Sequence, residues 1–358
     1  MWQHLLGNFP VGRSTEFLSS RSVGLVVLAA LGSFNAADAQ RLAPVQAADP
    51  LPSWNDDANK RIILGYVGRV TNATGKDFVA VADRIAVFDN DGTLWCERPI
   101  SVEFAFAFAG VDKYVALHPE LRDRQPYKAV IERDTLVLAT AGPQAIGEVM
   151  AVTHSRMTTT QFDSSVSAWL VSARHPRFDR RYTELVYQPM LELLGYLRAN
   201  GFRTFVVSGG GADFMRVWAA RSYAIAPDQI IGTTGRLSFE LRDGKALLRK
   251  LATVDLVEDG PGKPVGIHQY IGQQPILAFG NSDGDLQMLQ FTEDGHEDGG
   301  ARHPRMMLLL HHDDAVREYA YDRGSWIGRL DKALDEGRRR GWTIVSMKTD
   351  WKTVFKNP

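Results

Sequence analysis

The stretch that decides the expected fold is Ile85–Trp95, IAVFDNDGTLW. Four apolar residues, Ile85 to Phe88, are followed at once by two acids, Asp89 and Asp91, and by a glycine at position 92. A short run of buried-type residues predicts a strand inside a sheet. Two carboxylates at the mouth of such a strand do not suit core packing. They indicate a site, because ligands bind at the carboxyl ends of parallel strands.

Two carboxylates at one strand end suit the chemistry of phosphate esters. A carboxylate held there can attack phosphorus and form an acyl phosphate, which divides one difficult displacement into two easier ones. A second carboxylate can protonate the leaving alkoxide and later deprotonate water. The acids and the phosphate repel one another, so we expect a divalent cation, and oxygen ligands in a compact site favour Mg²⁺. A calcium-binding loop also contains Asp-x-Asp-Gly, but its twelfth residue is Glu, and here that residue is Ile100.

Three later stretches have features of the same site. Arg203–Val207 predicts a second apolar strand, which ends in Ser208 and three glycines whose amides are open to an anion. The helix expected over Ala212–Arg221 would point its positive end at that anion. Lys263 offers an ammonium that would neutralise a phosphate and an attacking carboxylate. Pro275–Gly280 is another apolar strand, followed by NSDGD and a helical stretch.

In this order the four stretches resemble motifs I to IV of the haloacid dehalogenase (HAD) superfamily, in the form of its phosphoserine-phosphatase-like branch. DNDGT matches the DxDGT of motif I, and GNSDGDLQML resembles the GDGxND-xxML form of motif IV. The resemblance implies a HAD-type hydrolase in which Asp89 is the nucleophile, Asp91 the general acid/base and Lys263 their cationic partner. It also implies phosphate contacts from Thr93, Ser208, Gly209 and Gly210, and Mg²⁺ ligands from Asp89, the carbonyl of Asp91, Asn281 and Asp285.

The sequence departs from the family pattern at Asn281, where the family has a metal-binding aspartate. An amide oxygen can ligate Mg²⁺ but carries no charge. We therefore expect weaker metal binding unless Asp283 or Asp285 compensates. The sequence leaves open which side chain completes the metal shell.

Alternating helices and apolar strands predict an α/β fold, a three-layer, Rossmann-like open parallel sheet with helices on both faces. We expect the core domain to comprise residues 58–104 and 188–358. Residues 105–187, between motifs I and II, have helical rather than strand patterns and predict an inserted helical cap. Two apolar runs, Arg236–Leu241 and Lys245–Leu251, flank Arg-Asp-Gly and predict a small β-hairpin.

The N-terminus has the pattern of a targeting segment. Arg13 and Arg21 precede the apolar run Val23–Leu31, so residues 1–39 are expected to be a signal peptide, with a buried core helix as the alternative. The run is too short to span a bilayer, which takes about 20 residues. Residues 40–57, rich in proline, are expected to form an exposed leader. A signal peptide implies a periplasmic or secreted protein.

Composition narrows the class of protein further. The chain has 358 residues, of which 44% are hydrophobic and 23% charged, as is ordinary for a globular protein. A net charge of −1 gives no support for a nucleic-acid or anionic-membrane surface. The single cysteine, Cys96, excludes an internal disulfide and is expected to be a buried, inert thiol. Nothing in the composition indicates the oligomeric state.

The core motifs would bind phosphate, so selectivity must come from the cap and from the segment after motif I. Glu97 lies one residue from the offset at which phosphoserine-phosphatase-like enzymes carry a glutamate that grips the substrate amine, with a surface residue as the alternative. Trp95 is equally expected to line the substrate site or to pack in the hydrophobic core. Arg177 is a candidate clamp for a second anionic group or a solvated charge. His311–Asp314, HHDD, resembles a metal cluster, but we expect a loop there.

The leading hypothesis is an exported, Mg²⁺-dependent phosphomonoesterase that acts on a small phosphorylated metabolite. A dehalogenase of the same superfamily is one alternative, although these enzymes lack the second motif I acid, here Asp91. A phosphotransferase that passes the phosphoryl group to another alcohol is a second. The third, a catalytically weak phosphate-compound binding protein of the periplasm, is kept open by Asn281.

Overall fold

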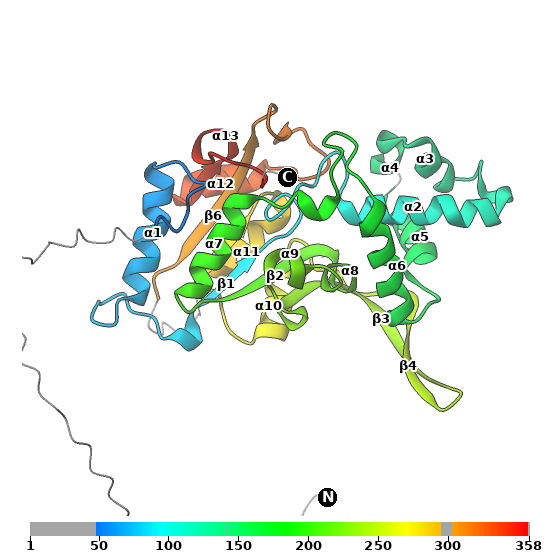
Figure 1. Ribbon diagram of the computed structural model, residues 1–358, viewed down its shortest axis with the longest axis horizontal. Coiled ribbons are helices and arrows are strands. Elements are labelled where there is room, and N and C mark those ends of the chain that lie inside the picture. The colour runs from blue at the N-terminus through cyan, green and yellow to red at the C-terminus, as the bar shows by residue number, and fades with distance from the viewer. Residues whose placement is uncertain (1–47, 141, 295–302, 357–358) are drawn as a thin grey trace, which may run out of the picture. The chain divides into compact units, whose positions relative to one another are not determined.

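The computed structural model describes residues 48–140, 142–294 and 303–356. They contain an eight-stranded sheet in the order β4-β3-β2-β1-β5-β6-β7, with β8 also paired to β6 (Figure 1). Pairing is parallel except between β3 and β4 and between β6 and β7. The strands are β1 (Ile85–Phe88), β2 (Arg203–Gly211), β3 (Ile230–Arg242), β4 (Lys245–Leu256), β5 (Leu277–Gly280), β6 (Met306–Asp313), β7 (Ala320–Tyr321) and β8 (Thr343–Ser346).

β1 lies inside the sheet, and all four of its residues are buried. It pairs in parallel with β2 on one side and with β5 on the other. Its last residue, Phe88, is in register with Val206 and Phe279. The chain therefore leaves β1 beside the carboxyl ends of both neighbours, and Asp89 emerges at that edge of the sheet.

The side chains of β1 alternate between two hydrophobic cores, one on each face of the sheet. Ala86 and Phe88 belong to one core, and Ile85 and Val87 to the other. This alternation is the period of two that a strand imposes, and helices cover both faces, which confirms the predicted three-layer α/β fold. The covering helices are α1 (Ala58–Thr71) and α7 (Gln188–Ala199) on the first core, and α10 (Gly262–Ile271), α11 (Leu286–Asp294) and α12 (Lys332–Arg340) on the second.

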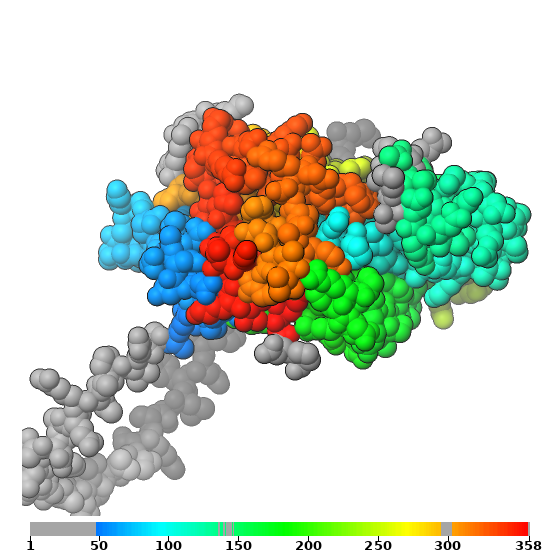
Figure 2. Space-filling model, turned by 90° about the horizontal axis from the view of Figure 1, so that it is seen from above, coloured from blue at the N-terminus to red at the C-terminus, as the bar shows by residue number. Residues whose placement is uncertain are grey.

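The segment between motifs I and II is helical and has a third hydrophobic core of its own. In Figure 2, α2 to α5 gather at one side of the described unit. The chain leaves the helical conformation at Arg133, which has a left-handed φ of 57°. The helices are α2 (Val102–Leu117), α3 (Tyr127–Glu132), α4 (Thr135–Thr140), α5 (Gly142–His154) and α6 (Thr159–Ser172).

The hairpin is longer than its sequence pattern predicts. β3 and β4 form its arms, and both turn residues, Asp243 (φ 51°) and Gly244 (φ 72°), are left-handed, as a two-residue hairpin turn requires. The helix expected after β2 is split into α8 (Ala212–Arg216) and α9 (Ala219–Tyr223). The last helix is α13 (Met347–Asp350).

Two expectations about exposed segments are wrong. The end of the expected leader belongs to the core: Leu51 and Trp54 are 0% exposed, and Trp54 packs edge-on against Trp351. His311–Asp313 are not loop residues but the last residues of β6. Leu51 and Trp54 lie in a proline-rich segment with a weak apolar pattern, whereas His311–Asp313 directly follow the apolar run Met306–Leu310, and β6 continues past the end of that run.

The expected signal peptide, 1–39, lies outside the described residues. Within the part of the chain that the structure describes, no helix combines the length and the apolar character that a membrane crossing would need.

Candidate active site

Lys263 links two carboxylates at the end of β1. It lies in the first turn of α10, and its Nζ donates hydrogen bonds to Asp89 Oδ1 and Asp285 Oδ1, both at 2.6 Å, and to the Val207 carbonyl at 3.0 Å. All three charged side chains are buried. A buried ammonium is tolerated only when it is paired and fully hydrogen-bonded, and here it has an acceptor for each of its three protons.

This pairing sets the charge states at the site. Burial lowers the pKa of Lys263, but the charges of Asp285 and Asp89 outweigh it and hold the pKa above its ordinary value, so the ammonium stays protonated. Burial raises the pKa of Asp89 well above its usual range, the charge of Asp285 adds to this, and Lys263 opposes it. The structure thus brings the expected nucleophile and its expected cation into direct contact.

Asp91 is held by a tryptophan. Its Oδ1 accepts a hydrogen bond from Trp95 Nε1 at 2.8 Å, and the Trp95 ring is stacked on Trp218 with centroids 4.0 Å apart. Burial raises the pKa of Asp91 to about 6. A carboxyl group with that pKa can both give and take a proton near neutral pH. Trp95 is 1% exposed, so of its two expected roles the structure supports core, and the ring also orients Asp91.

The motif II loop passes directly beside Asp91. Ser208 Oγ accepts a hydrogen bond from the Gly210 amide at 3.1 Å, and a Cβ placed on Gly210 would lie 3.4 Å from Asp91 Oδ2. Glu103 closes the loop from the other side, because its Oε2 accepts a hydrogen bond from the Gly211 amide at 2.7 Å. Its Oε1 lies 3.3 Å from His154 Nε2 in α5.

Sequence reasoning missed Glu103 and His154. Glu103 lies in the first turn of α2, where an acid is common because it complements the helix dipole. Nothing in the sequence separates that ordinary role from a place beside motif II. The structure makes the difference, since it puts this carboxylate 7% exposed against the glycine loop.

Asn281 lies between two partners at the base of motif I. Its Oδ1 accepts a hydrogen bond from Thr93 Oγ1 at 2.9 Å, and its Nδ2 donates one to Glu97 Oε1 at 2.9 Å. Tyr321 donates its hydroxyl to the same Glu97 oxygen at 2.7 Å. Burial raises the pKa of Glu97 well above its usual range. Glu97 is 4% exposed, so it is not the surface residue that was the alternative prediction.

The sequence left open whether Asp283 or Asp285 compensates for Asn281, and in the structure both carboxylates contact groups other than the Asn281 side chain. Asp283 Oδ1 accepts hydrogen bonds from the amides of Asp331 and Ala333, each at 2.9 Å, and thereby caps the start of α12. Asp285 uses one oxygen for Lys263, and its Oδ2 accepts from the amide of Asn281 at 2.9 Å. The acid that contacts the Asn281 side chain is Glu97.

A buried polar chain supports the motif I turn from behind. His312 Nε2 lies 2.7 Å from the carbonyl of Gly92, and His312 Nδ1 lies 3.3 Å from Glu318 Oε2. Both ring nitrogens therefore lie within hydrogen-bonding distance of an oxygen atom. Cys96 donates its thiol to Glu318 Oε1 at 2.9 Å, and burial raises the pKa of this thiol, as expected for an inert cysteine.

Arg177 is already engaged within the protein. Its guanidinium donates to the carbonyls of Ala315 and Val316 at 2.9 and 3.1 Å and to the carbonyl of Glu318, and it lies over the Tyr319 ring at 4.6 Å. With its donors used in this way, it anchors the loop after β6. The structure therefore does not support the expected role of Arg177 as a clamp for substrate.

A bound cation fits this group of residues. Asp89 Oδ2 accepts no hydrogen bond from any described residue, and burial raises the pKa of Asp89, of Asp91 and of Glu97, so the site gathers acids where their charged forms are unfavourable. No group of three or more His, Cys, Asp or Glu side chains within the described ranges is arranged to hold a metal. A cation would thus need carbonyl and amide oxygens as well, and Asp89, the Asp91 carbonyl and Asn281 supply that donor set.

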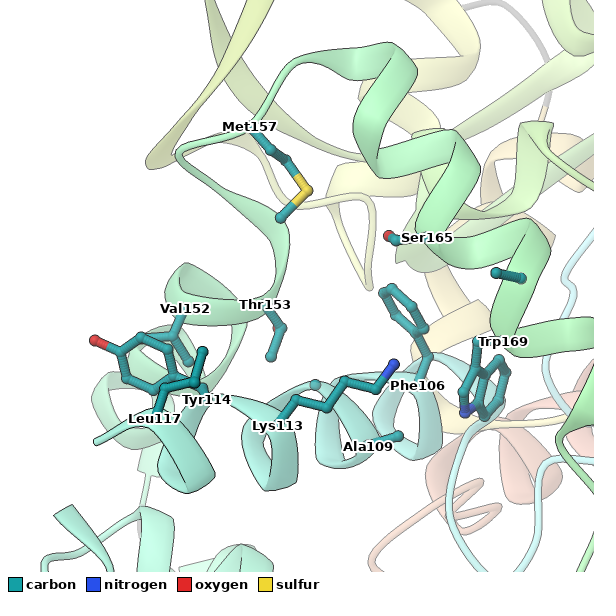
Figure 3. A pocket seen from close by; sticks show the side chains of 12 residues that line it. Phe106, Ala109, Lys113, Tyr114, Leu117, Val152, Thr153, Met157, Ser165 and Trp169 are labelled. Carbon is teal, nitrogen blue, oxygen red and sulfur yellow. The ribbon is translucent and has the colours of Figure 1, made fainter. Parts of the chain in front are cut away.

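A separate hollow of about 300 Å³ lies within the helical segment, between α2, α5 and α6 (Figure 3). Phe106, Met157 and Trp169 line it, and Lys113 runs along one wall. Phe106 also packs against Phe214 of α8 at 5.6 Å. No residue of the four motifs lines this hollow, so it is distinct from the site at the end of β1.

The fold and the site together define a class of protein: an open α/β sheet whose first strand ends in an aspartate pair, with a lysine from a later helix and a helical insertion after the first motif. The model of the haloacid dehalogenase-like hydrolase family matches residues 86–290. The chain belongs to this family.

Solved structures similar to this chain include three bacterial proteins. A protein of unknown function from Anaerococcus prevotii is 15% identical, with 80% of this chain and 91% of that chain covered and a TM-score of 0.49. One from Bordetella pertussis, also of unknown function, is 16% identical, with 73% and 97% covered and a TM-score of 0.43. A phosphoserine phosphohydrolase-like protein from Francisella tularensis is 13% identical, with 72% and 99% covered and a TM-score of 0.37. No curated protein matches the chain.

Proposed function

We propose that this protein is an exported, Mg²⁺-dependent phosphomonoester hydrolase that acts on a small phosphorylated metabolite through an aspartyl-phosphate on Asp89. The observation that carries the proposal is the buried ammonium of Lys263, 2.6 Å from both Asp89 Oδ1 and Asp285 Oδ1. An ammonium fixed against a nucleophilic carboxylate offsets the repulsion between that carboxylate and an incoming phosphate.

In the first step a carboxylate oxygen of Asp89 attacks phosphorus, and the bond between phosphorus and the ester oxygen breaks. The acyl phosphate forms on Asp89, and the ester oxygen leaves as an alcohol because it takes the proton of Asp91. A pKa of about 6 keeps part of Asp91 protonated near neutral pH. The hydrogen bond from Trp95 Nε1 holds this carboxyl group in one orientation.

In the second step water attacks phosphorus, the bond between phosphorus and the Asp89 oxygen breaks, and inorganic phosphate leaves. The proton of the water passes to Asp91, which returns the site to its starting state. The Ser208 hydroxyl and the Gly209 amide lie on the motif II loop, and we assign them to the oxygens of the transferred group. Mg²⁺, when bound by Asp89, the Asp91 carbonyl and Asn281, would neutralise charge on the phosphoryl group.

The test of this mechanism is Asp89→Asn, which removes the nucleophile and keeps the size of the side chain. We expect hydrolysis of p-nitrophenyl phosphate to fall at least about a hundredfold, because the covalent route is lost. Mass spectrometry of acid-quenched reactions should show a phosphorylated wild-type protein and no such species in the variant. Asp228→Asn, at an exposed position, is the matched control. A folded Asp89→Asn protein that turned over at the wild-type rate would rule the mechanism out.

One alternative function is supported by a specific observation. The amide of Asn281 carries no charge, so the same site would also suit a catalytically weak protein that binds a phosphorylated compound. Repeated turnover in the presence of Mg²⁺ separates hydrolysis from stoichiometric binding. Chloride release from a 2-haloacid without metal would instead favour a dehalogenase. Export rests on the pattern of residues 1–39, and a reporter fused after that segment that stayed inside the cell would contradict it.

A further inference from the structure

The position that carries the motif IV acid in this family is neutral in this chain, and the structure shows which acid contacts its side chain. Asn281 Nδ2 donates to Glu97 Oε1 at 2.9 Å, whereas Asp285 accepts from the Asn281 backbone amide and Asp283 from the amides at the start of α12. Glu97 comes from the segment after motif I, so the amide and the acid that meet here are 184 residues apart in sequence. The acid missing at position 281 thus has a counterpart in Glu97, which lies one side chain away from that position.

The contact also decides which end of the Asn281 amide is free to act. Glu97 Oε1 is the acceptor in this contact, so the amide nitrogen of Asn281 faces Glu97. The amide oxygen then lies on the other side, where Thr93 Oγ1 donates to it at 2.9 Å. An amide oxygen has a second lone pair, whereas an amide nitrogen cannot ligate a cation. Glu97 therefore leaves Asn281 in the orientation in which it can serve a metal.

Glu97 lies at a place that is costly for a carboxylate. It is 4% exposed, and a carboxylate taken out of water is costly unless a cation or hydrogen-bond donors offset its charge. Space for it is created by glycines, because a Cβ on Gly92 or on Gly328 would overlap its carboxylate. Tyr321 adds a hydrogen bond at 2.7 Å that fixes the same oxygen.

We propose that Glu97 is a positioning residue of the cation site: it orients the Asn281 amide and supplies, one side chain away, the negative charge that Asn281 lacks. The inference rests on the Mg²⁺ site of the proposed function. In that site the pair of Glu97 and Asn281 takes the place of the single motif IV aspartate. It assigns Glu97 to the metal rather than to the substrate amine.

The experiment measures Mg²⁺ binding to the metal-free full chain by isothermal titration calorimetry, without substrate. Glu97→Gln removes the charge and keeps the shape, and we expect the Kd for Mg²⁺ to rise about 10- to 100-fold, the range for residues that support metal ligands. Exchanging the two groups, in Glu97→Gln with Asn281→Asp, restores one acid and one amide in contact. We expect this double variant to return to within about threefold of the wild-type Kd. Glu120→Gln, at an exposed position, is the control.

Thermal unfolding of each metal-free variant shows whether it is folded. If Glu97→Gln alone does not fold, the double variant still tests the idea, because it keeps a carboxylate beside an amide. An unchanged Kd in Glu97→Gln, a double variant that binds as weakly as the single one, or a wild type without Mg²⁺ affinity would each overturn the inference. Failure of the proposed function gives a different pattern: Mg²⁺ binds and depends on Glu97, yet no phosphomonoester is hydrolysed.

Discussion

Replacing Lys263 with methionine keeps the length of the side chain but removes the ammonium that three acceptors share. Asp89 Oδ1 and Asp285 Oδ1 each lose a hydrogen bond of 2.6 Å, and the Val207 carbonyl loses one of 3.0 Å. Both carboxylates stay buried, since Asp89 is 6% and Asp285 0% exposed. Removing one partner of a buried ion pair typically costs about 3–5 kcal/mol. We expect a loss of this size in the free energy of unfolding at pH 8.

The loss should depend on pH with a definite sign. Burial and the charge of Asp285 already raise the pKa of Asp89 in the wild type, and without Lys263 this pKa rises further. A carboxyl group whose pKa is higher in the folded than in the unfolded state contributes stability at low pH. That contribution is lost as the pH rises through the folded pKa. The deficit of Lys263→Met should therefore be smallest near pH 5 and grow by at most about 1.4 kcal/mol per pH unit for this group.

Urea unfolding followed by circular dichroism at several pH values measures the effect. Lys245→Met, at an exposed position at the start of β4, is the matched control and should change stability by less than about 0.5 kcal/mol at every pH. A variant as stable as the wild type at pH 8 would refute the reasoning. So would a deficit that shrinks as the pH rises, because then the buried carboxylates could not be its cause.

Two further perturbations test other parts of the site. Because Asp91 must start protonated and burial raises its pKa to about 6, kcat/KM for an alkyl phosphate should fall as the pH rises above that value; a rate that is flat from pH 5 to 8 would exclude this role. Gly92→Ala should destabilise the protein more than Gly244→Ala, as unfolding experiments can show. Both have positive φ, 78° and 72°, so each substitution costs about 1–2 kcal/mol in the backbone, but only a Cβ on Gly92 would overlap Asn281 and Glu97. Equal losses would contradict the packing described for motif I.

The fold could be predicted because its signals are local. A four-residue apolar strand, a turn glycine and the order of four short motifs are enough to predict an open parallel sheet, but the position of β1 between β2 and β5 comes from the structure. Parallel strands that end in polar residues meet at one edge of the sheet, so motifs I, II and IV are expected there. Lys263 lies in the first turn of a helix, and its approach to Asp89 was expected from the resemblance to motif III. The helical segment between motifs I and II is likewise visible as a pattern, although the break at Arg133 is not.

What could not be predicted is which side chains meet across elements. Glu103 looks like any acid in a first helical turn, and its contact with Gly211 depends on how α2 packs over the motif II loop. His312 lies in a sequence that resembles a metal cluster, yet it supports the carbonyl of Gly92. Leu51 is buried in a segment that reads as an exposed leader because its neighbours are polar and proline-rich. In each case the contacting residue is distant in sequence, so the local hydrophobic pattern contains no signal of the contact.

The sequence and the structure lead to different interpretations of Asn281. Considered alone in the sequence, it is a lost charge and an argument for a weak or inactive site. Considered with its contacts, it is one half of a pair whose other half is Glu97, a buried acid. A motif alone therefore does not give the total charge of a site. An acid can be absent from its usual motif position if an acid from another segment lies at the same place, as Glu97 does beside Asn281. For this site the balance of buried charges, rather than the match at one position, should decide whether Mg²⁺ binds.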